Sequence, residues 1–212
     1  MSGGPEPLPP EDFRGLLRRE LPRWNLTAPD ATLDRLSSFL AELDRWRTRI
    51  NLTGRLSAPD LVSHALESIL GERHLPEGAR VVDIGTGGGF PGVPLAIWRP
   101  DLDVTWLEPR EKRAAFLRHL ARAIPVPNAR VREARQEDLP AASFGYATSR
   151  AVKIDSRSVK EAPFLEPGGA LLLWTTSPGR LAAELAPTGL RLEATVPIPG
   201  SRQRAIGVFR KP

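Results

Sequence analysis

One stretch of the chain decides the fold: Val81-Val82-Asp83-Ile84-Gly85-Thr86-Gly87-Gly88-Gly89-Phe90-Pro91-Gly92-Val93-Pro94. It opens with an apolar, β-branched run that is typical of a buried parallel strand. Its glycines let the backbone turn sharply and approach a ligand closely. An apolar, helix-compatible run follows over residues 93–98. Strand, glycine turn and helix in that order predict a nucleotide-binding loop, with the free N–H groups of the helix N-terminus directed at the ligand.

Two nucleotide cofactors fit this loop, and a glycine-rich connection with no ligand is a third alternative. Gly87-x-Gly89-x-x-Gly92 satisfies the dinucleotide fingerprint, whereas Asp83-x-Gly85-x-Gly87-x-Gly89 is the usual pattern for S-adenosylmethionine. Glu108 ends the next apolar run, where an acid can accept hydrogen bonds from both ribose hydroxyls of either cofactor. Asp83 favours S-adenosylmethionine, because an acid there can reach the amino group of a methionine moiety and would repel a pyrophosphate.

Composition limits the classes of protein that remain. The 212 residues, 41% of them hydrophobic, suffice for one α/β domain with an extension. The absence of cysteine excludes disulfides, thiolate zinc sites and a cysteine nucleophile, and three histidines argue against a multi-histidine metal centre, so we expect no metal. No apolar run reaches transmembrane length and the N-terminus lacks a signal-peptide core, so we expect a cytoplasmic protein without membrane contact. The net charge of +5 suits a polyanionic partner, or serves solubility alone.

The first 75 residues predict a helical cap. Residues 1–10 contain four prolines and two glycines, and we expect them to be disordered. Helical spacing follows over 13–21, and Asp30 is a plausible N-cap for a longer helix with apolar residues from Leu33 to Ile50. Ser57-Ala58-Pro59-Asp60 resembles a capping box and opens a third helix, to about Leu70. No flexible linker precedes the first strand, so residues 1–75 should pack on a domain of residues 76–212 as one compact unit.

The remainder of the chain alternates between strand and helix. We expect strands near 104–107, 130–133, 146–148, 170–174, 190–196 and 204–209, a turn at 166–169, and helices near 110–124, 153–162 and 181–185. This order is typical of an α/β protein with a doubly wound, parallel, Rossmann-like sheet. Ligands bind at the carboxyl ends of such strands. One cleft is therefore expected to contain Gly85, Glu108, Gln136, Glu137 and Arg150.

Several motifs together resemble one known family. They are Leu43-Asp44-Arg45-Trp46 with Ile50-Asn51-Leu52-Thr53, His64-Ala65-Leu66-Glu67-Ser68, the glycine segment with its discriminating Phe90-Pro91-Gly92-Val93-Pro94, Lys112-Arg113-Ala114-Ala115-Phe116-Leu117, and Ser149-Arg150-Ala151-Val152. Over about residues 40–175 the chain resembles the RsmG (GidB) family of 16S ribosomal RNA guanine-N7 methyltransferases. The resemblance implies a class I methyltransferase fold, S-adenosylmethionine as cofactor, and cofactor contacts at Gly85, Phe90, Gln136, Glu137 and Arg150, with Glu108 near the ribose. Asp83 and Gly87 complete the expected cofactor site.

Two positions depart from the family pattern. Glu67 stands where the family usually has aspartate, and Trp174-Thr175-Thr176 stands where a Lys-Gly pair is usual. The second departure leaves open which cation, if any, takes that lysine's place.

The implied reaction asks little of side chains. Guanine N7 carries a free lone pair, so no proton has to be removed, and alignment of the reactants alone lowers the barrier by up to ~7–11 kcal/mol in well-oriented systems. Arg150 is therefore expected to steer the guanine or hold the cofactor, a structural ion pair being the alternative. His64 fits a packing role better than that of a base, and Asn51 suits a helix cap and an RNA contact equally.

Ribosomal RNA, free or in a small-subunit particle, is the implied partner of a monomeric enzyme. The RNA-binding residues that we expect are Asn51, His64, Arg110, Arg113, Lys153 and Arg157. Two other classes of function stay open. An NAD-dependent oxidoreductase is disfavoured because no second substrate domain follows the sheet, and a non-catalytic RNA-binding module would keep the fold without an intact cofactor site.

Overall fold

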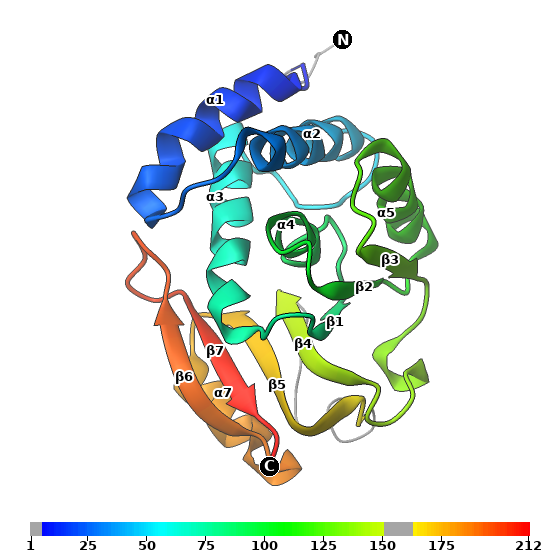
Figure 1. The fold of residues 1–212 in the computed structure, drawn as a ribbon, viewed down its shortest axis with the longest axis vertical. Helices are drawn as coiled ribbons and strands as arrows, with labels where there is room; N and C mark the ends of the chain where they lie inside the picture. The colour runs from blue at the N-terminus through cyan, green and yellow to red at the C-terminus, as the bar shows by residue number, and fades with distance from the viewer. Residues whose placement is uncertain (1–5, 151–162) are drawn as a thin grey trace.

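A seven-stranded sheet forms the centre of the molecule, with strand order β3-β2-β1-β4-β5-β7-β6 (Figure 1). The computed structural model describes residues 6–150 and 163–212. The strands are β1 (Arg80–Ile84), β2 (Asp103–Leu107), β3 (Ala129–Arg132), β4 (Phe144–Arg150), β5 (Leu165–Thr175), β6 (Arg191–Pro197) and β7 (Ala205–Arg210). The helices are α1 (Pro10–Glu20), α2 (Asp30–Trp46), α3 (Ala58–Ile69), α4 (Gly92–Trp98), α5 (Glu111–Ala123) and α7 (Pro178–Leu185).

Strands β1 to β5 are parallel, and β7 runs antiparallel to both of its neighbours. The expectation of a parallel sheet is therefore right for the first five strands and wrong for β7. The reason is the short connection between β6 and β7, residues 198–204, because a parallel pair needs a crossover of a dozen or more residues. The sheet order reverses between β1 and β4, which places a topological switch point at the carboxyl end of β1.

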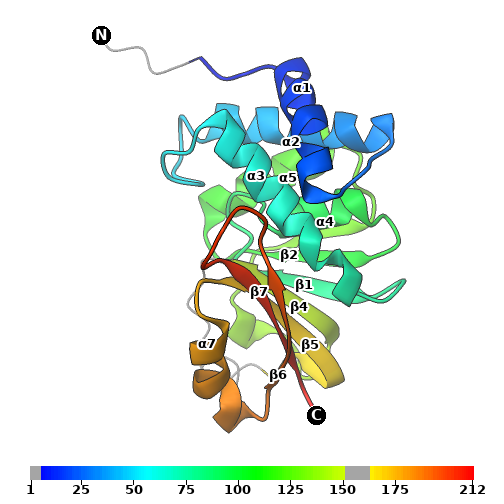
Figure 2. The same cartoon turned by 90° about the vertical axis from the view of Figure 1, so that its left-hand side faces the viewer.

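Alternation along the strands divides the core into two clusters, one on each face of the sheet. Val81, Val104 and Trp106 belong to the larger cluster, which also contains most of the buried apolar residues of α1 to α5. Val82 and Leu107 belong to the smaller cluster, which contains Leu185 of α7. Figure 2 shows α7 on the opposite side of the sheet from α3 and α4. Successive side chains of a strand point to opposite faces, so both faces of these strands are apolar and buried.

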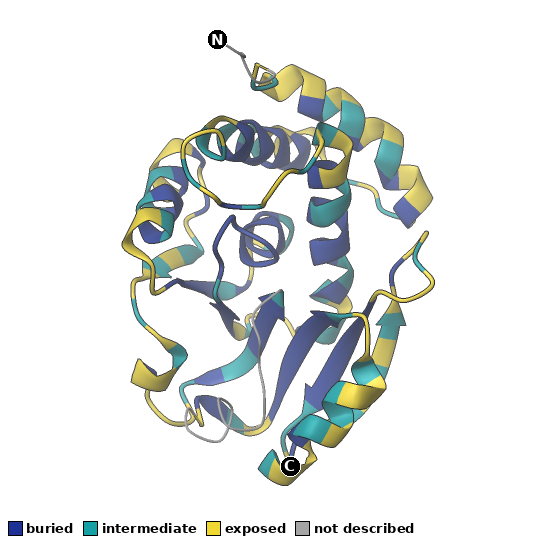
Figure 3. Cartoon of the chain, turned by 180° about the vertical axis from the view of Figure 1, so that it is seen from behind, coloured by how far each residue is buried: buried dark blue, intermediate teal, exposed yellow. Residues whose placement is uncertain are grey.

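Helices α1, α2 and α3 of the N-terminal part of the chain lie together beside the sheet, with α4 between α2 and the strands. Helix α4 is short and buried on nearly every side, as its colour in Figure 3 shows. Helices α2 and α3 both contact it, and α1 crosses both of these. The capping box of α3 is confirmed: the Ser57 hydroxyl accepts from the Asp60 N–H, and the Asp60 carboxylate accepts from the Ser57 N–H at 2.9 Å.

Two expectations at the N-terminus need correction. Residues 1–5 lie outside the described residues, but residues 6–10 are placed: the Leu8 N–H donates to Asp44 Oδ2 at 2.9 Å, and Pro10 begins α1. Asp30 is not the N-cap of α2, since Pro29 takes that position. The Asp30 carboxylate instead pairs with Arg14 at 2.9 Å and with Arg18 at 2.8 Å, which ties α1 to α2.

The predicted turn at 166–169 is part of β5, and β4 is longer than expected at both ends. The pairing of these two strands shifts register between Phe144 and Tyr146. Gly169 sits so close to the partner strand that a Cβ would lie 2.5 Å from the Gly145 carbonyl oxygen. Glycine therefore lets the strand continue through an irregularity that the sequence suggests is a turn. The predicted helix at 153–162 lies outside the described residues.

Candidate functional site

The glycine loop is fixed to the end of β2 by backbone hydrogen bonds. The N–H groups of Gly85 and Thr86 donate to the Leu107 carbonyl at 2.8 and 3.1 Å, and the Thr86 hydroxyl donates to the Asp83 carbonyl at 2.9 Å. Gly85 adopts a φ of 69°, a conformation that costs little only for glycine. The loop is thus a rigid rim at the topological switch point.

Two further glycines serve the contact with the helical cap. A Cβ on Gly88 would lie 2.9 Å from the Thr53 methyl group, and one on Gly89 would lie 2.7 Å from the Phe39 ring. The cap therefore rests directly on the loop. Packing against the cap therefore requires glycine at these two positions. The sequence pattern alone suggests that they serve ligand binding instead.

Asp83 lies beneath the loop, and its side chain has no exposed surface. Its carboxylate accepts from the Gly92 N–H at 3.1 Å and from the Thr148 hydroxyl at 2.8 Å. Burial raises the pKa of this carboxyl to about 7, against the hydrogen bonds from Thr148, Thr86 and Gly92 that lower it. The geometry thus gives Asp83 the task of holding the loop to β4 and to α4, rather than the expected contact with a cofactor's amino group. The Gly92 N–H at the start of α4 therefore donates to Asp83 and does not point at the ligand, although the sequence suggests that it would.

Glu108 borders a cavity of about 360 Å³ at the carboxyl ends of β1, β2 and β3. We call it the Glu108 cavity; its lining is Ile84, Gly85, Leu107, Glu108, Pro109, Arg110, Arg113, Ala134, Arg135, Gln136 and Glu137. The Glu108 carboxylate accepts from the Gly87 N–H at 3.0 Å and from the Arg110 N–H at 2.9 Å, one bond to each oxygen. A carboxylate has about four lone-pair sites, so both oxygens can accept another donor without moving.

A second cavity, of about 190 Å³, lies on the other side of the glycine loop. This Arg150 cavity is lined by Leu52, Thr53, Leu56, His64, Gly85, Thr86, Gly87, Gly88, Phe90, Arg113 and Arg150. Gly85 and Arg113 border both cavities, so the two meet at the end of β1. The structure thus brings together Gly85, Gly87, Phe90, Glu108, Gln136, Glu137 and Arg150 around adjoining cavities, as expected from the sequence.

Ionic contacts fix Arg150 in its cavity. Its guanidinium pairs with Glu67 Oε2 at 2.8 Å, and Glu67 Oε1 pairs with Arg204 at 2.5 Å. Beside them, burial and then the positive charges of Arg150 and Arg204 lower the pKa of His64 to about 4. The His64 ring packs edge-on against Phe90, with ring centroids 5.8 Å apart. His64 is therefore neutral at physiological pH and a weak base, which agrees with the packing role expected for it.

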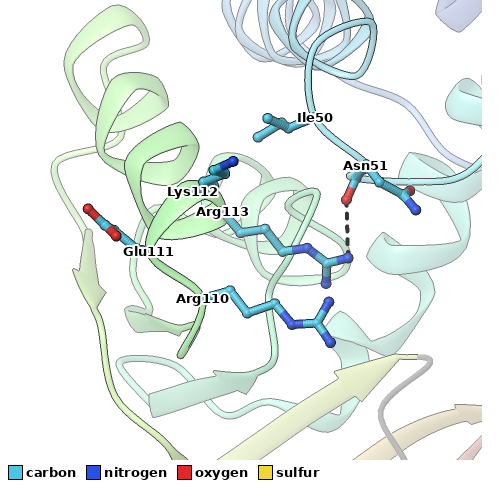
Figure 4. Close-up of a pocket in the computed structure, with 6 residues that line it drawn as sticks. All are labelled: Ile50, Asn51, Arg110, Glu111, Lys112 and Arg113. Carbon is cyan, nitrogen blue, oxygen red and sulfur yellow. Dashed lines mark hydrogen bonds between the residues drawn. The ribbon is translucent and has the colours of Figure 1, made fainter.

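A third cavity, of about 320 Å³, adjoins the Glu108 cavity and is basic (Figure 4). Its lining is Ile50, Asn51, Arg110, Glu111, Lys112 and Arg113. Arg113 Nη2 donates to the Asn51 carbonyl at 3.1 Å, while the Glu111 side chain points away from both. Helix α2 ends at Trp46, so Asn51 does not cap it; its side chain accepts from the Gly54 N–H at 3.2 Å. The other two expected RNA contacts, Lys153 and Arg157, lie outside the described residues.

The family model for rRNA small subunit methyltransferase G, GidB, matches residues 32–179. The chain belongs to this family. A relative named ribosomal RNA small subunit methyltransferase G, from Halorhodospira halophila, is 39% identical over 149 residues, which cover 69% of this chain and 70% of the relative. A protein of the same name from Xanthomonas campestris pv. campestris (strain B100) is 36% identical over 193 residues, 89% of each chain. The family resemblance predicted from the motifs is thus confirmed.

Solved structures support the fold. A SAM-dependent methyltransferase from Aquifex aeolicus matches with a TM-score of 0.57 at 18% identity, covering 68% of this chain and 87% of that chain. The [4+2]-cyclase SpnF matches with a TM-score of 0.58 at 16% identity, covering 76% and 85%. The fold alone does not determine the reaction, since one neighbour is named a cyclase. Family and fold together confirm the predicted class I methyltransferase and S-adenosylmethionine as its cofactor, and neither alternative function is favoured.

Within the GidB family, this chain's two departures meet at one place in the structure. The indole N–H of Trp174 donates to the Glu67 carbonyl at 3.0 Å, and the indole ring lies against Gly71, where a Cβ would approach it to 3.0 Å. A cation nevertheless reaches Glu67, from Arg204 in the connection before β7. Arg204 was not predicted as a site residue because no motif surrounds it in the sequence. The available signal was the loss of the family's usual lysine near Trp174.

Proposed function

We propose that this chain transfers a methyl group from S-adenosylmethionine to N7 of a guanine in 16S ribosomal RNA. The observation that carries the proposal is that two cavities meet at Gly85, one bordered by an immobilised carboxylate and the other by an arginine. We propose further that residues 1–75 and 76–212 act as one unit, as a cytoplasmic monomer. The described residues include no helix with the length and apolarity to span a bilayer.

The carboxylate acceptor of the Glu108 cavity fits the nucleoside end of the cofactor. The free lone pairs of Glu108 suit two ribose hydroxyls, and the fixed orientation of its carboxylate means that little entropy is lost on binding. The cavity volume falls within the range of about 300–1,000 Å³ that is usual for small-ligand sites. The methionine end would then lie past Gly85 in the Arg150 cavity, where S-adenosylmethionine supplies an electrophilic methyl group.

The Arg150 cavity positions groups and does not move protons. Among its described lining residues, His64 is the side chain best suited to act as a base, and its pKa of about 4 makes it a poor one. An acceptor with a free lone pair, such as guanine N7, needs none. Arg150 and Phe90 would orient the reactants, and the Phe39 ring behind Phe90, with centroids 5.4 Å apart, holds it in place.

The third cavity supplies an electrostatic surface for RNA. Arg110 is the N-cap of α5, and Lys112 and Arg113 lie in its first turn; Arg110 and Arg113 also line the Glu108 cavity. Basic side chains of this kind neutralise backbone phosphates and position a nucleic acid without reading its sequence. We therefore propose that 16S RNA, free or in a small-subunit particle, crosses this surface.

A methyl-transfer assay tests the proposal. The protein is incubated with methyl-labelled S-adenosylmethionine and either 16S RNA or small-subunit particles lacking the modification, and the digested nucleosides are identified. We expect the label in 7-methylguanosine. Arg150→Ala should reduce transfer, and Glu11→Gln, at an exposed residue of α1 that lines none of the three cavities, should not. Label in another nucleoside, or no transfer to either substrate, would contradict the proposal.

A further inference from the structure

Glu67 is an unusually placed carboxylate. Its side chain is 1% exposed, on α3 below the Arg150 cavity. A charge is rarely buried to this extent without a partner, because removing it from water costs several kcal/mol, by order of magnitude. Glu67 has two partners, one for each oxygen: Arg150 at 2.8 Å and Arg204 at 2.5 Å.

The two arginines differ in their surroundings. The Arg150 side chain is 15% exposed and faces a cavity, whereas the Arg204 side chain is 42% exposed and lies in the connection between β6 and β7. With Arg150 alone, Glu67 would form a neutral pair, and Arg150 would attract anions weakly. Arg204 gives the three linked groups a net charge of +1. Burial lowers the pKa of Arg150 most; Glu67 acts against this and raises it, while the positive charge of Arg204 lowers it further, so the three groups are coupled electrostatically.

We propose that Arg204 is a positioning residue that balances the charge of Glu67, so that Arg150 can bind the carboxylate of the cofactor's methionine end. The inference rests on the proposed function in one respect, the placement of that end in the Arg150 cavity. It gives Arg204, which lines none of the three cavities described above, an effect on cofactor affinity through Glu67 and Arg150. It also explains why a buried carboxylate lies next to a residue that must attract an anion.

Charge-compensating variants test the proposal. Calorimetry measures the affinity of S-adenosylhomocysteine and of its decarboxylated analogue, and the ratio of the two reports recognition of the carboxylate. Arg204→Gln should reduce this ratio about tenfold. This is the effect expected when one unit charge is removed at a separation of roughly 12 Å, counted from the Arg204 guanidinium to the bound carboxylate, at an effective dielectric constant of about 20. Arg204→Lys keeps the charge and should keep the ratio. Arg202→Gln removes an exposed charge from the same connection and is the matched control.

The double variant Glu67→Gln/Arg204→Gln decides between charge balance and a structural role. It restores the net charge of +1 on Arg150, so the ratio should return to within about twofold of the wild-type value, although two ion pairs are lost. If Glu67→Gln and Arg204→Gln each lower the ratio and the double variant lowers it further, the proposal is overturned. It is also overturned if Arg204→Gln lowers affinity for both ligands equally. A loss of RNA affinity with an unchanged ratio would overturn it as well. Wild-type protein that binds neither ligand would contradict the proposed function instead.

Discussion

Replacement of Glu108 by alanine should weaken cofactor binding without unfolding the protein. The carboxylate is held by the Gly87 and Arg110 N–H groups at 3.0 and 2.9 Å, so it meets the ribose hydroxyls already oriented. Hydrogen bonds to a charged acceptor contribute about 1.5–3 kcal/mol, which corresponds to a dissociation constant raised roughly 10- to 150-fold. Arg110 lines the Glu108 cavity and Gly87 lines the adjoining Arg150 cavity, so water can replace the lost acceptor at both N–H groups. The free energy of unfolding should therefore fall by only about 1–2 kcal/mol.

Calorimetry with S-adenosylhomocysteine and with its 2′-deoxyribose analogue measures this effect. Wild-type protein should prefer the ribose ligand, and Glu108→Ala should bind both with similar affinity, because the acceptor that distinguishes them is gone. Glu111→Gln removes a negative charge three residues away at a position that does not line the Glu108 cavity, and it serves as the control. A dissociation constant unchanged in Glu108→Ala, or a preference for ribose that survives the substitution, would refute the placement of the ribose.

Three other predictions concern the loop, the RNA surface and His64. Gly85→Val should weaken cofactor binding more than Glu108→Ala does, because the φ of 69° is strained for a β-branched residue. Gly179→Val, in open space, should leave binding unchanged. Equal affinities of Gly85→Val and wild-type protein in calorimetry would mean that the loop only connects β1 and α4. RNA affinity should fall steeply with salt, and Arg110→Gln or Arg113→Gln should each reduce the logarithmic salt slope by about 0.7–0.9, unlike Arg122→Gln at the far end of α5. A salt-independent affinity would argue against the basic surface. His64 has a pKa of about 4 in the folded protein, below its unfolded value of 6.5, so the unfolded state binds more protons and stability should fall as pH drops from 6.5 towards 4. Urea unfolding at pH 7 and pH 5 should show a smaller fall in His64→Ala, and an equal fall in both proteins would exclude His64 as the cause.

The order of elements and the edge of the sheet that carries the site follow from sequence patterns. These patterns are local: each apolar run, glycine turn or strand-ending acid is recognised from a few neighbouring residues. Parallel strands then bring their carboxyl ends to one edge of the sheet. Gly85, Glu108, Gln136 and Arg150 are therefore found together from the sequence alone. The direction of the Asp83 side chain was harder to predict. Asp83 lies two residues after Val81 in β1, so both side chains point to the face of the sheet that α4 covers, and not to the cavity.

Long-range contacts explain what the sequence could not predict. Arg204 reaches Glu67 only because β7 inserts between β5 and β6, and no local pattern specifies that insertion. Gly88 and Gly89 resemble ligand-binding glycines, yet their neighbours are Thr53 and Phe39 of the cap. The strand β5 continues through residues that favour a turn because its pairing with β4 outweighs local preference.

The most direct test of the proposed function replaces the acceptor atom. In single turnovers with bound RNA, transfer should be nearly flat from about pH 6 to 9, because no base has to titrate. Replacing the target guanine by 7-deazaguanine puts carbon in place of N7 while keeping the base-pairing edge, and should abolish transfer without weakening RNA binding. Continued methylation of the analogue, or a rate that rises about tenfold per pH unit, would contradict N7 as the acceptor and require a base.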